Sequence, residues 1–171
     1  MRFILVLFLA LLLLLAQAQA DQFNDGQAAF NRKDYQTAYN LLQPLADKGN
    51  AKAQYKLGYM YDGGQGVKQD YAEAMKWYRK AADQGNGAAQ YQIGMMYRFG
   101  RGVKQDYAEA MKWFQKSANA GLPADQALAE LMIGGMYHRG EGVPKDEAEA
   151  QKWFNKAYDN GFPRPIPPVE K

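Results

Sequence analysis

The sequence predicts an all-α protein, an α-solenoid made of antiparallel helix pairs. The string GVKQDYAEAMKW occurs twice, at 66–77 and 102–113, and a variant of it, GVPKDEAEAQKW, follows at 142–153. The tryptophans that end these strings are 36 and 40 residues apart, and the tyrosines Tyr61, Tyr97 and Tyr137 keep the same two intervals. A period of about 34 to 40 residues is typical of helix-pair repeats.

The first helix of each pair should carry one apolar face. Ala53, Leu57 and Tyr61 recur at helical spacing and form such a stripe in the first repeat. The third repeat gains four residues near 122–125, about one helical turn, which predicts a longer first helix with the same face. The expected first helices are 51–61, 88–97 and 127–137.

Each first helix also contains an internal glycine, at Gly58, Gly94 and Gly134. Glycine inside a helix costs up to about 1 kcal/mol relative to alanine. Because this cost recurs in every copy, we expect the backbone of the neighbouring helix to approach closely there.

A glycine-rich turn and an Asp-x-x-Glu sequence precede each second helix. Glycine readily adopts the positive φ that such turns need. The aspartate is placed to cap the helix, and the glutamate three residues later gives the spacing of a capping box. The pairs are Asp70–Glu73, Asp106–Glu109 and Asp146–Glu149.

The second helices should bury an apolar stripe and end at a glycine. In the first repeat the stripe consists of Ala74, Trp77, Tyr78 and Ala81. The terminating glycines are Gly85, Gly121 and Gly161.

The first twenty residues have the pattern of a secretory signal peptide. Arg2 precedes an unbroken apolar run at 4–15, and small residues stand at −3 and −1 of a cut before Asp21. The alternative is an uncleaved anchor helix, but this run is short against the roughly 20 apolar residues that a span needs. We expect cleavage after Ala20 and a periplasmic or secreted mature chain that has no membrane span.

Charge and cysteine content narrow the possible partners. The formal net charge is +3, and +2 once Arg2 is removed, with basic and acidic residues interleaved. Nucleic acid and strongly anionic membranes are therefore not implied as partners. The chain contains no cysteine, so packing rather than disulfides must stabilise the fold.

The repeated residues resemble a known family. The pattern A-x-x-x-LG-x-x-Y-x-x-G-x-GV-x-x-D-x-x-x-A-x-x-W-x-x-K-A, read at 53–81 and with small variations at 89–118 and 129–157, is similar to Sel1-like repeats. These repeats belong to the tetratricopeptide-like helical-repeat superfamily. The resemblance implies a right-handed superhelix that acts as an adaptor for proteins or peptides, and exported bacterial relatives act in envelope signalling, assembly or host contact.

The expected domain organisation follows from the repeats and their flanks. Residues 34–49 match the second-helix pattern without its tryptophan, and a helix is expected before them around 22–31, so 21–50 forms an atypical terminal repeat. The prolines after Phe162 rule out a further helix and leave the last helix pair without a successor. The segments are a signal peptide at 1–20, a tetratricopeptide-like cap at 21–50, repeats at 51–86, 87–122 and 123–162, and a Pro-rich tail at 163–171.

The inventory of catalytic side chains is thin. Ser117, Thr37 and His138 are the only serine, threonine and histidine, so no nucleophile–base set can be assembled. A serine β-lactamase would need S-x-x-K, whereas Ser117 begins the string SANA. Ser117 is better explained as a small residue at a helix interface, and His138 as a loop or rim residue. We expect no enzyme activity, cofactor or metal.

Partner binding is expected on the first helices, where the copies differ beside the apolar stripe. Tyrosine, arginine and methionine, which are common at protein interfaces, occur there. The alternative is that some of the tyrosines pack between repeats. The candidates are Lys52, Tyr55, Tyr59 and Asp62; Tyr91, Met95 and Arg98; and Leu131, Gly135 and His138.

The sequence thus favours an exported, non-enzymatic adaptor that holds a protein or peptide on the concave face of the solenoid. Two alternatives stay open. One is a hydrolase such as the β-lactamase-like activity attributed to some cysteine-rich relatives. The other is a purely structural protein that stacks end to end through its last repeat.

Overall fold

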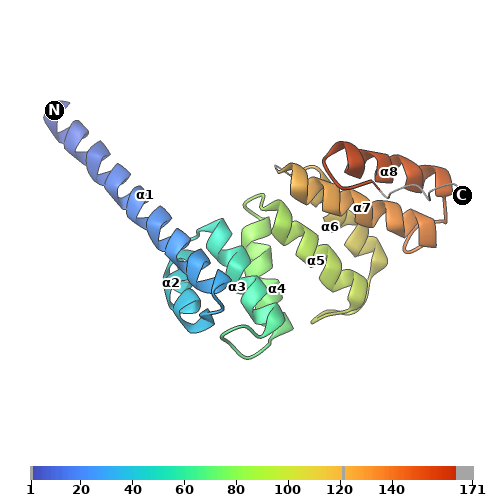
Figure 1. Ribbon diagram of the computed structural model, residues 1–171, viewed down its shortest axis with the longest axis horizontal. Helices are drawn as coiled ribbons and strands as arrows, with labels where there is room; N and C mark the ends of the chain where they lie inside the picture. The colour runs from blue at the N-terminus through green and yellow to red at the C-terminus, as the bar shows by residue number, and fades with distance from the viewer. Residues whose placement is uncertain (1, 121, 165–171) are drawn as a thin grey trace, which may run out of the picture. The chain divides into compact units, whose positions relative to one another are not determined.

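The computed structural model describes residues 2–120 and 122–164 (Figure 1). All regular structure in these residues is α-helical, which confirms the predicted all-α class. The helices are α1 (Arg2–Asn31), α2 (Tyr35–Asp47), α3 (Ala51–Gly63), α4 (Tyr71–Ala82), α5 (Gly87–Phe99), α6 (Tyr107–Ala118), α7 (Pro123–Arg139) and α8 (Glu147–Asp159).

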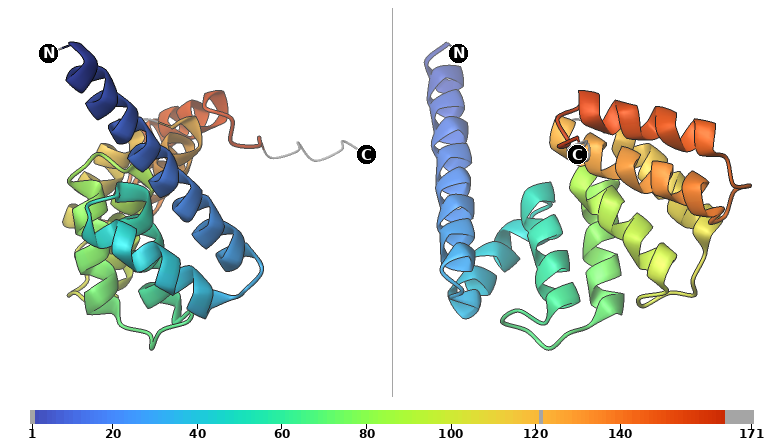
Figure 2. Two further views of the ribbon diagram at one scale, coloured as in Figure 1. Left: turned by 90° about the vertical axis from the view of Figure 1, so that its left-hand side faces the viewer. Right: turned by 45° about the vertical axis from the view of Figure 1, so that its right-hand side comes forward.

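The chain forms two compact units, Met1–Trp77 and Tyr78–Lys171, with the boundary inside α4. In the first unit α2 packs against both α1 and α3. In the second unit α5 pairs with α6 and α7 pairs with α8, while α6 also contacts α7 (Figure 2). Within each unit, consecutive helices are therefore neighbours in space.

The longer first helix of the third repeat is present as predicted. Helix α7 has 17 residues, whereas α3 and α5 have 13 each. Ile133 and Met136 on α7 are fully buried, as Ile93 and Met96 are on α5. The extra turn is added at the N-terminal end, so the buried face of the helix is unchanged.

The aspartate caps of the second helices form, but the expected capping box does not. Asp106 accepts a hydrogen bond from the Glu109 backbone N–H at 2.9 Å, and Asp70 and Asp146 make the same contact. The backbone N–H of Asp106 donates to the carbonyl of Tyr97, at 2.9 Å, rather than to the Glu109 carboxylate. Glu109 instead pairs with Lys112 at 2.9 Å, one turn along the helix. The glutamate is thus part of an exposed ion pair, and not of the cap.

The internal glycines accommodate aromatic rings more than backbone. A Cβ at Gly94 would lie 2.7 Å from the Phe114 ring, and a Cβ at Gly134 would lie 2.6 Å from the Phe154 ring. At Gly134 the carbonyl oxygen of Ala150 is also within 3.1 Å. The expected close approach exists in the second unit, but a ring on the second helix of the same pair makes the nearest contact.

In two of the GV strings, the opening glycine packs against the previous repeat. Gly142 has φ 71°, and a Cβ there would lie 2.7 Å from Cβ of Tyr107, the residue that begins α6. Gly66, at φ 74°, meets Tyr35 at the start of α2 in the same way. The repeated string therefore contains both halves of this contact, the glycine and the helix-starting tyrosine.

The predicted buried stripe is correct for the first repeat, where Ala74, Trp77, Tyr78 and Ala81 are all buried. In the second repeat the residue after the tryptophan is more deeply buried than the tryptophan itself. Phe114 is fully buried, whereas Trp113 is only partly buried. Glycines Gly85 and Gly161 end their helices with positive φ, while the third predicted terminator, Gly121, lies outside the described residues.

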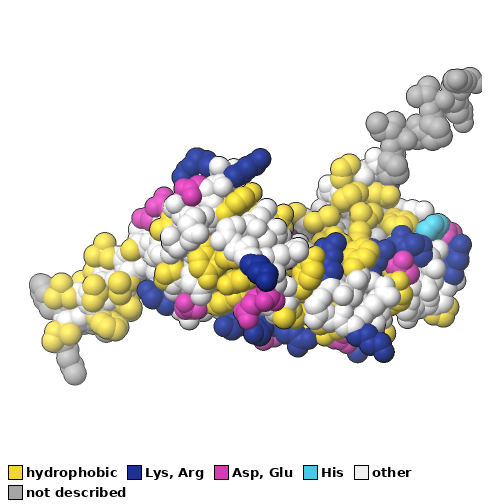
Figure 3. All heavy atoms as spheres, turned by 90° about the horizontal axis from the view of Figure 1, so that it is seen from below, with side chains coloured by type: hydrophobic (Ala, Val, Ile, Leu, Met, Phe, Trp, Pro, Cys, Tyr) yellow, Lys and Arg dark blue, Asp and Glu magenta, His cyan; other side chains and the backbone are white. Residues whose placement is uncertain are grey.

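The N-terminal helix is longer than the sequence pattern predicts. The helix expected around 22–31 continues back through the apolar segment to Arg2 as one 30-residue helix. The apolar side chains that the structure describes in this segment are exposed, from Ile4 to Leu15, and they cover the free end of α1 (yellow, left of Figure 3). Helix α1 is long and apolar enough to cross a membrane. A signal sequence near the N-terminus meets the same criterion of length and composition.

Candidate partner-binding surface

His138, which the sequence placed in a loop or at the rim, is helical, as are its counterparts in the other repeats. Asp62, Arg98 and His138 each lie in the last turn of a first helix, in α3, α5 and α7. The turns begin two residues later, at glycines with φ between 64° and 72°. The sequence placed the helix ends too early because the turn glycines, and not the tyrosines, terminate these helices.

In the first unit, Tyr59 is part of a partly exposed cluster of aromatic and cationic side chains. Its side chain is 38% exposed and contacts Phe30 at the end of α1 edge to face, with 5.9 Å between ring centroids. The Lys56 ammonium lies 4.4 Å from the centre of the Phe30 ring, and burial lowers the pKa of Lys56. The sequence did not identify Phe30 or Lys56 as candidates, because helix α1 brings Phe30 beside α3 only in the folded unit.

The remaining candidates on α3 differ in exposure. Lys52 is exposed, while Tyr55 and Asp62 are half-buried. Lys52 and Tyr59 are therefore the α3 candidates whose side chains are most accessible to a partner.

In the second unit, Tyr91 packs against the core. Its ring centroid is 5.7 Å from that of Phe114, and the side chain is half-buried. Burial raises the pKa of Tyr91, an effect that the nearby positive charge of Arg98 opposes. The contacts of Tyr91 are therefore those of a packed tyrosine, which was the alternative to a partner-binding role.

Arg98 joins two repeats through an ion pair. Its Nε donates to Oε2 of Glu141 at 3.0 Å, and the arginine side chain is only 13% exposed. Glu141 also accepts a hydrogen bond from Nε of Arg139 at 2.8 Å. Burial alone would raise the pKa of Glu141, but the hydrogen bonds and charges of Arg139 and Arg98 outweigh it and hold the pKa below its ordinary value.

The α7 candidates are likewise engaged within the unit. Leu131 is half-buried, and the guanidinium of Arg139 covers the position where Gly135 lacks a side chain. His138 Nδ1 lies 2.9 Å from Oε2 of Glu147, and both side chains are at least half exposed. No group of three or more potential metal ligands occurs among the described residues.

Ser117 lies inside the helix interface, where the sequence placed it. It is fully buried, and its hydroxyl donates to the carbonyl oxygen of Gly87 at 2.9 Å. The hydroxyl is therefore used to satisfy the first turn of α5. This arrangement explains the residue without any catalytic role.

Comparison with known proteins identifies the architecture. The sequence model of the Sel1 repeat matches four segments, 25–50, 51–86, 87–122 and 127–162. The chain belongs to the Sel1 repeat family. The first matched segment covers α2 and the end of α1, so the shortened N-terminal pair is itself recognised as a Sel1 repeat. A comparison with curated protein sequences gave no match.

Solved structures of Sel1 repeat proteins are similar to this chain. A Sel1 repeat protein from Oxalobacter formigenes has 34% sequence identity and a TM-score of 0.72, over 81% of this chain and 56% of that one. The protein c5321, a protective antigen of uropathogenic Escherichia coli with an SLR fold, has 36% identity and a TM-score of 0.77, over 90% of this chain and 33% of that one. Cysteine-rich protein B of Helicobacter pylori, at 24% identity and a TM-score of 0.54 over 71% of this chain and 89% of that one, shares the fold. The chain thus spans about half or less of the first two relatives.

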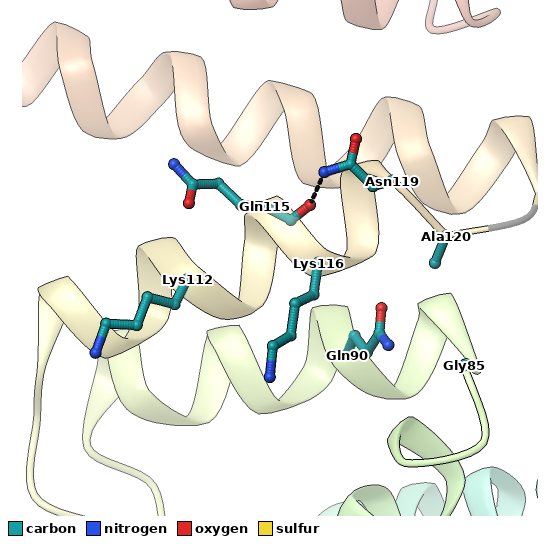
Figure 4. A pocket seen from close by; sticks show the side chains of 7 residues that line it. All are labelled: Gly85, Gln90, Lys112, Gln115, Lys116, Asn119 and Ala120. Atoms are coloured by element: carbon teal, nitrogen blue, oxygen red, sulfur yellow. Dashed lines mark hydrogen bonds between the residues drawn. The ribbon is translucent and has the colours of Figure 1, made fainter.

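The second unit of this Sel1 repeat protein also contains a hollow that the sequence did not reveal. It has a volume of about 640 Å³ and lies between α5, α6 and the turn that precedes α5 (Figure 4). Gln90 forms part of its wall, Lys112 and Lys116 extend along one side of it, and Ala120 lies near one end. A signal for this site does exist in the sequence. Ala120 stands where the third repeat has Asn160, if the repeats are aligned on their tryptophans.

Proposed function

We propose that this Sel1 repeat protein is an exported, non-enzymatic adaptor that binds a protein or peptide partner on the surface of its first helices. Sel1 repeat proteins are helical scaffolds that commonly bind other proteins. The observation that carries the proposal is the partly exposed cluster of Tyr59, Phe30 and Lys56. Aromatic side chains such as those of Tyr59 and Phe30 are enriched at protein interfaces, and Lys56 adds a positive charge beside them.

The structure separates candidate residues that can be replaced without harm to the fold from those that cannot. Tyr91 and Arg98 make packing and ion-pair contacts within the second unit, so their removal would disturb the fold as well as any binding surface. Lys52 and Tyr59 are accessible, and their loss should leave the core intact. We therefore assign the first test of partner binding to α3.

A photo-crosslinking amino acid at position 52 should capture the partner in cells, and Tyr59→Ala should abolish that capture without changing the helical circular dichroism. The same crosslinker at Lys104, an exposed turn residue of the second unit, serves as the control. Equal capture from both positions, or capture that survives Tyr59→Ala, would contradict binding on α3.

Export can be tested separately. If the signal peptide is cleaved after Ala20, N-terminal sequencing of the mature protein should begin at Asp21. The protein should then be found in the periplasmic or extracellular fraction. A membrane-bound protein that retains residues 1–20 would support the anchor alternative instead.

A second candidate, self-association through the last repeat, is favoured by one observation. An apolar hollow of about 390 Å³ lies between the start of α7 and the residues after α8, and Leu128 and Phe162 line it. The exposed Leu122 lies beside it in sequence. Light scattering of the mature chain with and without residues 162–171 tests this candidate, because stacking through this end should change with the deletion.

A further inference from the structure

One buried polar side chain occurs at the same position in the first helix of each full repeat. Gln54, Gln90 and Glu130 are all at least 92% buried. Gln54 Nε2 donates to the carbonyl oxygen of Ala46 at 3.0 Å, and Gln90 Nε2 donates to that of Ala82 at 3.2 Å. In both cases the amide satisfies the end of the preceding second helix.

The third repeat shows what can complete this site. Glu130 has no N–H to donate, and its Oε2 accepts a hydrogen bond from Nδ2 of Asn160 at 2.8 Å. Asn160 is the C-cap of α8, the second helix of the same repeat. A donor on the C-terminal end of the second helix thus reaches the buried acceptor on the first.

The second repeat lacks that donor. Ala120 occupies the place of Asn160, and Gln90 Oε1 is buried without a hydrogen-bond partner among the described residues. The amide cannot turn over to relieve this, because its Nε2 faces the Ala82 carbonyl oxygen and an exchange would bring two acceptors together. Buried polar atoms in folded proteins are nearly always paired. The unpaired oxygen is therefore an acceptor that a donor from outside the chain can satisfy.

The charged groups around Gln90 indicate the charge of the ligand that would carry this donor. The hollow of about 640 Å³ extends from Gly85 and Ala120, past Gln90, to the ammonium groups of Lys116 and Lys112 (Figure 4). Lys116 Nζ lies 4.0 Å from the centre of the Trp113 ring, and Lys112 pairs with Glu109 at the surface. The lysine end therefore favours a negative group on a ligand.

We propose that this hollow binds an extended acidic segment of a partner protein, with a peptide or side-chain N–H donated to Gln90 Oε1 and an aspartate or glutamate carboxylate beside Lys112 and Lys116. A peptide supplies both groups at neighbouring positions, whereas a free carboxylate or sulfate ion supplies no donor for Gln90. The inference rests on the proposed adaptor function and gives it a second binding surface, in the unit that does not contain Tyr59.

The third repeat provides a matched control, because it has the same two lysines but no unpaired acceptor. Lys152 and Lys156 are the equivalents of Lys112 and Lys116 in the third repeat, and Lys156 lies 4.4 Å from the Trp153 ring. There, however, Asn160 already donates to the buried acceptor. We expect acidic peptide to bind the second repeat and not the third.

The test uses the mature chain and the neutral-ended peptide acetyl-Gly-Asn-Glu-Glu-Gly-amide, followed by the side-chain amide signal of Gln90 in nitrogen-15 NMR spectra. Saturable shifts of the Gln90 signal are expected. The variant Ala120→Asn supplies the missing donor from within, so it should reduce peptide affinity at least tenfold and raise the melting temperature. The double variant Lys112→Gln/Lys116→Gln should also reduce affinity at least tenfold, whereas Lys152→Gln/Lys156→Gln should leave it unchanged.

Several results would overturn the proposal. These are an unshifted Gln90 signal, equal binding by Ala120→Asn, equal binding of the same peptide with Gln in place of Glu, and displacement of the peptide by an equal concentration of inorganic phosphate. None of them affects capture of a partner from position 52. Failure of this site and failure of the proposed adaptor function are therefore distinguishable.

Discussion

Arg98, at the end of α5, donates two hydrogen bonds to Glu141, in the turn that follows α7. The Nε–Oε2 distance is 3.0 Å and the Nη2–Oε1 distance is 3.4 Å, with both side chains less than 20% exposed. The pair joins consecutive repeats at the end of the first helices, where the sequence had suggested a residue free to meet a partner. In this Sel1 repeat protein, a position that varies between copies thus serves to join two of them.

Removing Arg98 should destabilise the second unit. Arg98→Ala leaves Glu141 partly buried with only Arg139 as a partner, so we expect a loss of about 1 to 3 kcal/mol in the free energy of unfolding. Urea unfolding followed by circular dichroism measures it. Lys104→Ala, at an exposed turn residue, should change stability by less than about 0.5 kcal/mol. An equal effect of the two substitutions would show that the ion pair contributes nothing.

The same ion pair predicts a pH dependence. The folded pKa of Glu141 lies below its ordinary value of 4.5, so the ionised carboxylate stabilises the folded state at higher pH. This contribution should be fully present above pH 4.5 and should be lost as the pH falls from there through the lowered folded pKa. Unfolding measured from pH 6 down to pH 3 should therefore show a smaller acid-induced loss for Glu141→Gln than for the unaltered chain. A larger loss for the variant would contradict the assignment.

Two adjacent glycines in α7 offer a matched pair of substitutions. A Cβ at Gly134 would lie 2.6 Å from the Phe154 ring and 3.1 Å from a backbone oxygen, whereas a Cβ at Gly135 would meet the flexible end of Arg139. Gly134→Ala should destabilise by about 1 to 3 kcal/mol through overpacking. Gly135→Ala should be neutral, or stabilising by up to about 1 kcal/mol, because alanine favours the helix. Thermal unfolding of both variants decides the point, and a cost at Gly135 equal to that at Gly134 would refute the packing explanation.

The aspartate caps predict that Asp106 and Glu109 contribute very differently to stability. Asp106→Ala removes the acceptor for the Glu109 N–H and should cost about 1 kcal/mol, while Asp106→Asn should keep most of the cap. Glu109→Gln should change stability by less than about 0.5 kcal/mol, because its exposed pair with Lys112 is worth little. Equilibrium unfolding of the three variants checks this order, and a large cost for Glu109→Gln would restore the capping box.

Much of the fold could be predicted because the relevant signals are local. The Asp caps, the turn glycines and the apolar stripes each depend on residues within one or two helical turns. The failures concern contacts between helices. The Asp106 N–H is taken by a carbonyl of the preceding helix, and Arg98 is taken by Glu141, 43 residues later. Such pairings are set by how the helices pack, which a repeat pattern alone does not specify.

In the candidate site, too, local features could be predicted from the sequence and contacts between helices could not. Tyr59 could be found from the variation between copies, but its neighbours Phe30 and Lys56 could not, since Phe30 reaches it from another helix. The hollow beside Gln90 was hidden for a different reason. The substitution of Ala120 for an asparagine is visible in the aligned repeats, yet its consequence requires knowing that Asn160 donates to Glu130. Differences between copies become informative once the partner of each side chain is known.

The last prediction concerns two tyrosines in the first unit. The hydroxyls of Tyr39 on α2 and Tyr61 on α3 lie 3.2 Å apart, and this hydrogen bond, together with burial, raises the pKa of Tyr61 to about 12. A raised phenol pKa means that the neutral form is favoured in the folded state. Its contribution to stability is thus present below pH 10 and is lost as the pH rises through 12. Tyr39→Phe should lower the pKa of Tyr61 towards 10, measured from the phenolate absorbance near 295 nm, with Tyr71→Phe as the control for an unrelated phenol. Because the bond links α2 to α3, the same variant should also reduce stability at neutral pH by about 0.5 to 1.5 kcal/mol. An unchanged titration of Tyr61 would show that burial alone, and not Tyr39, holds its proton.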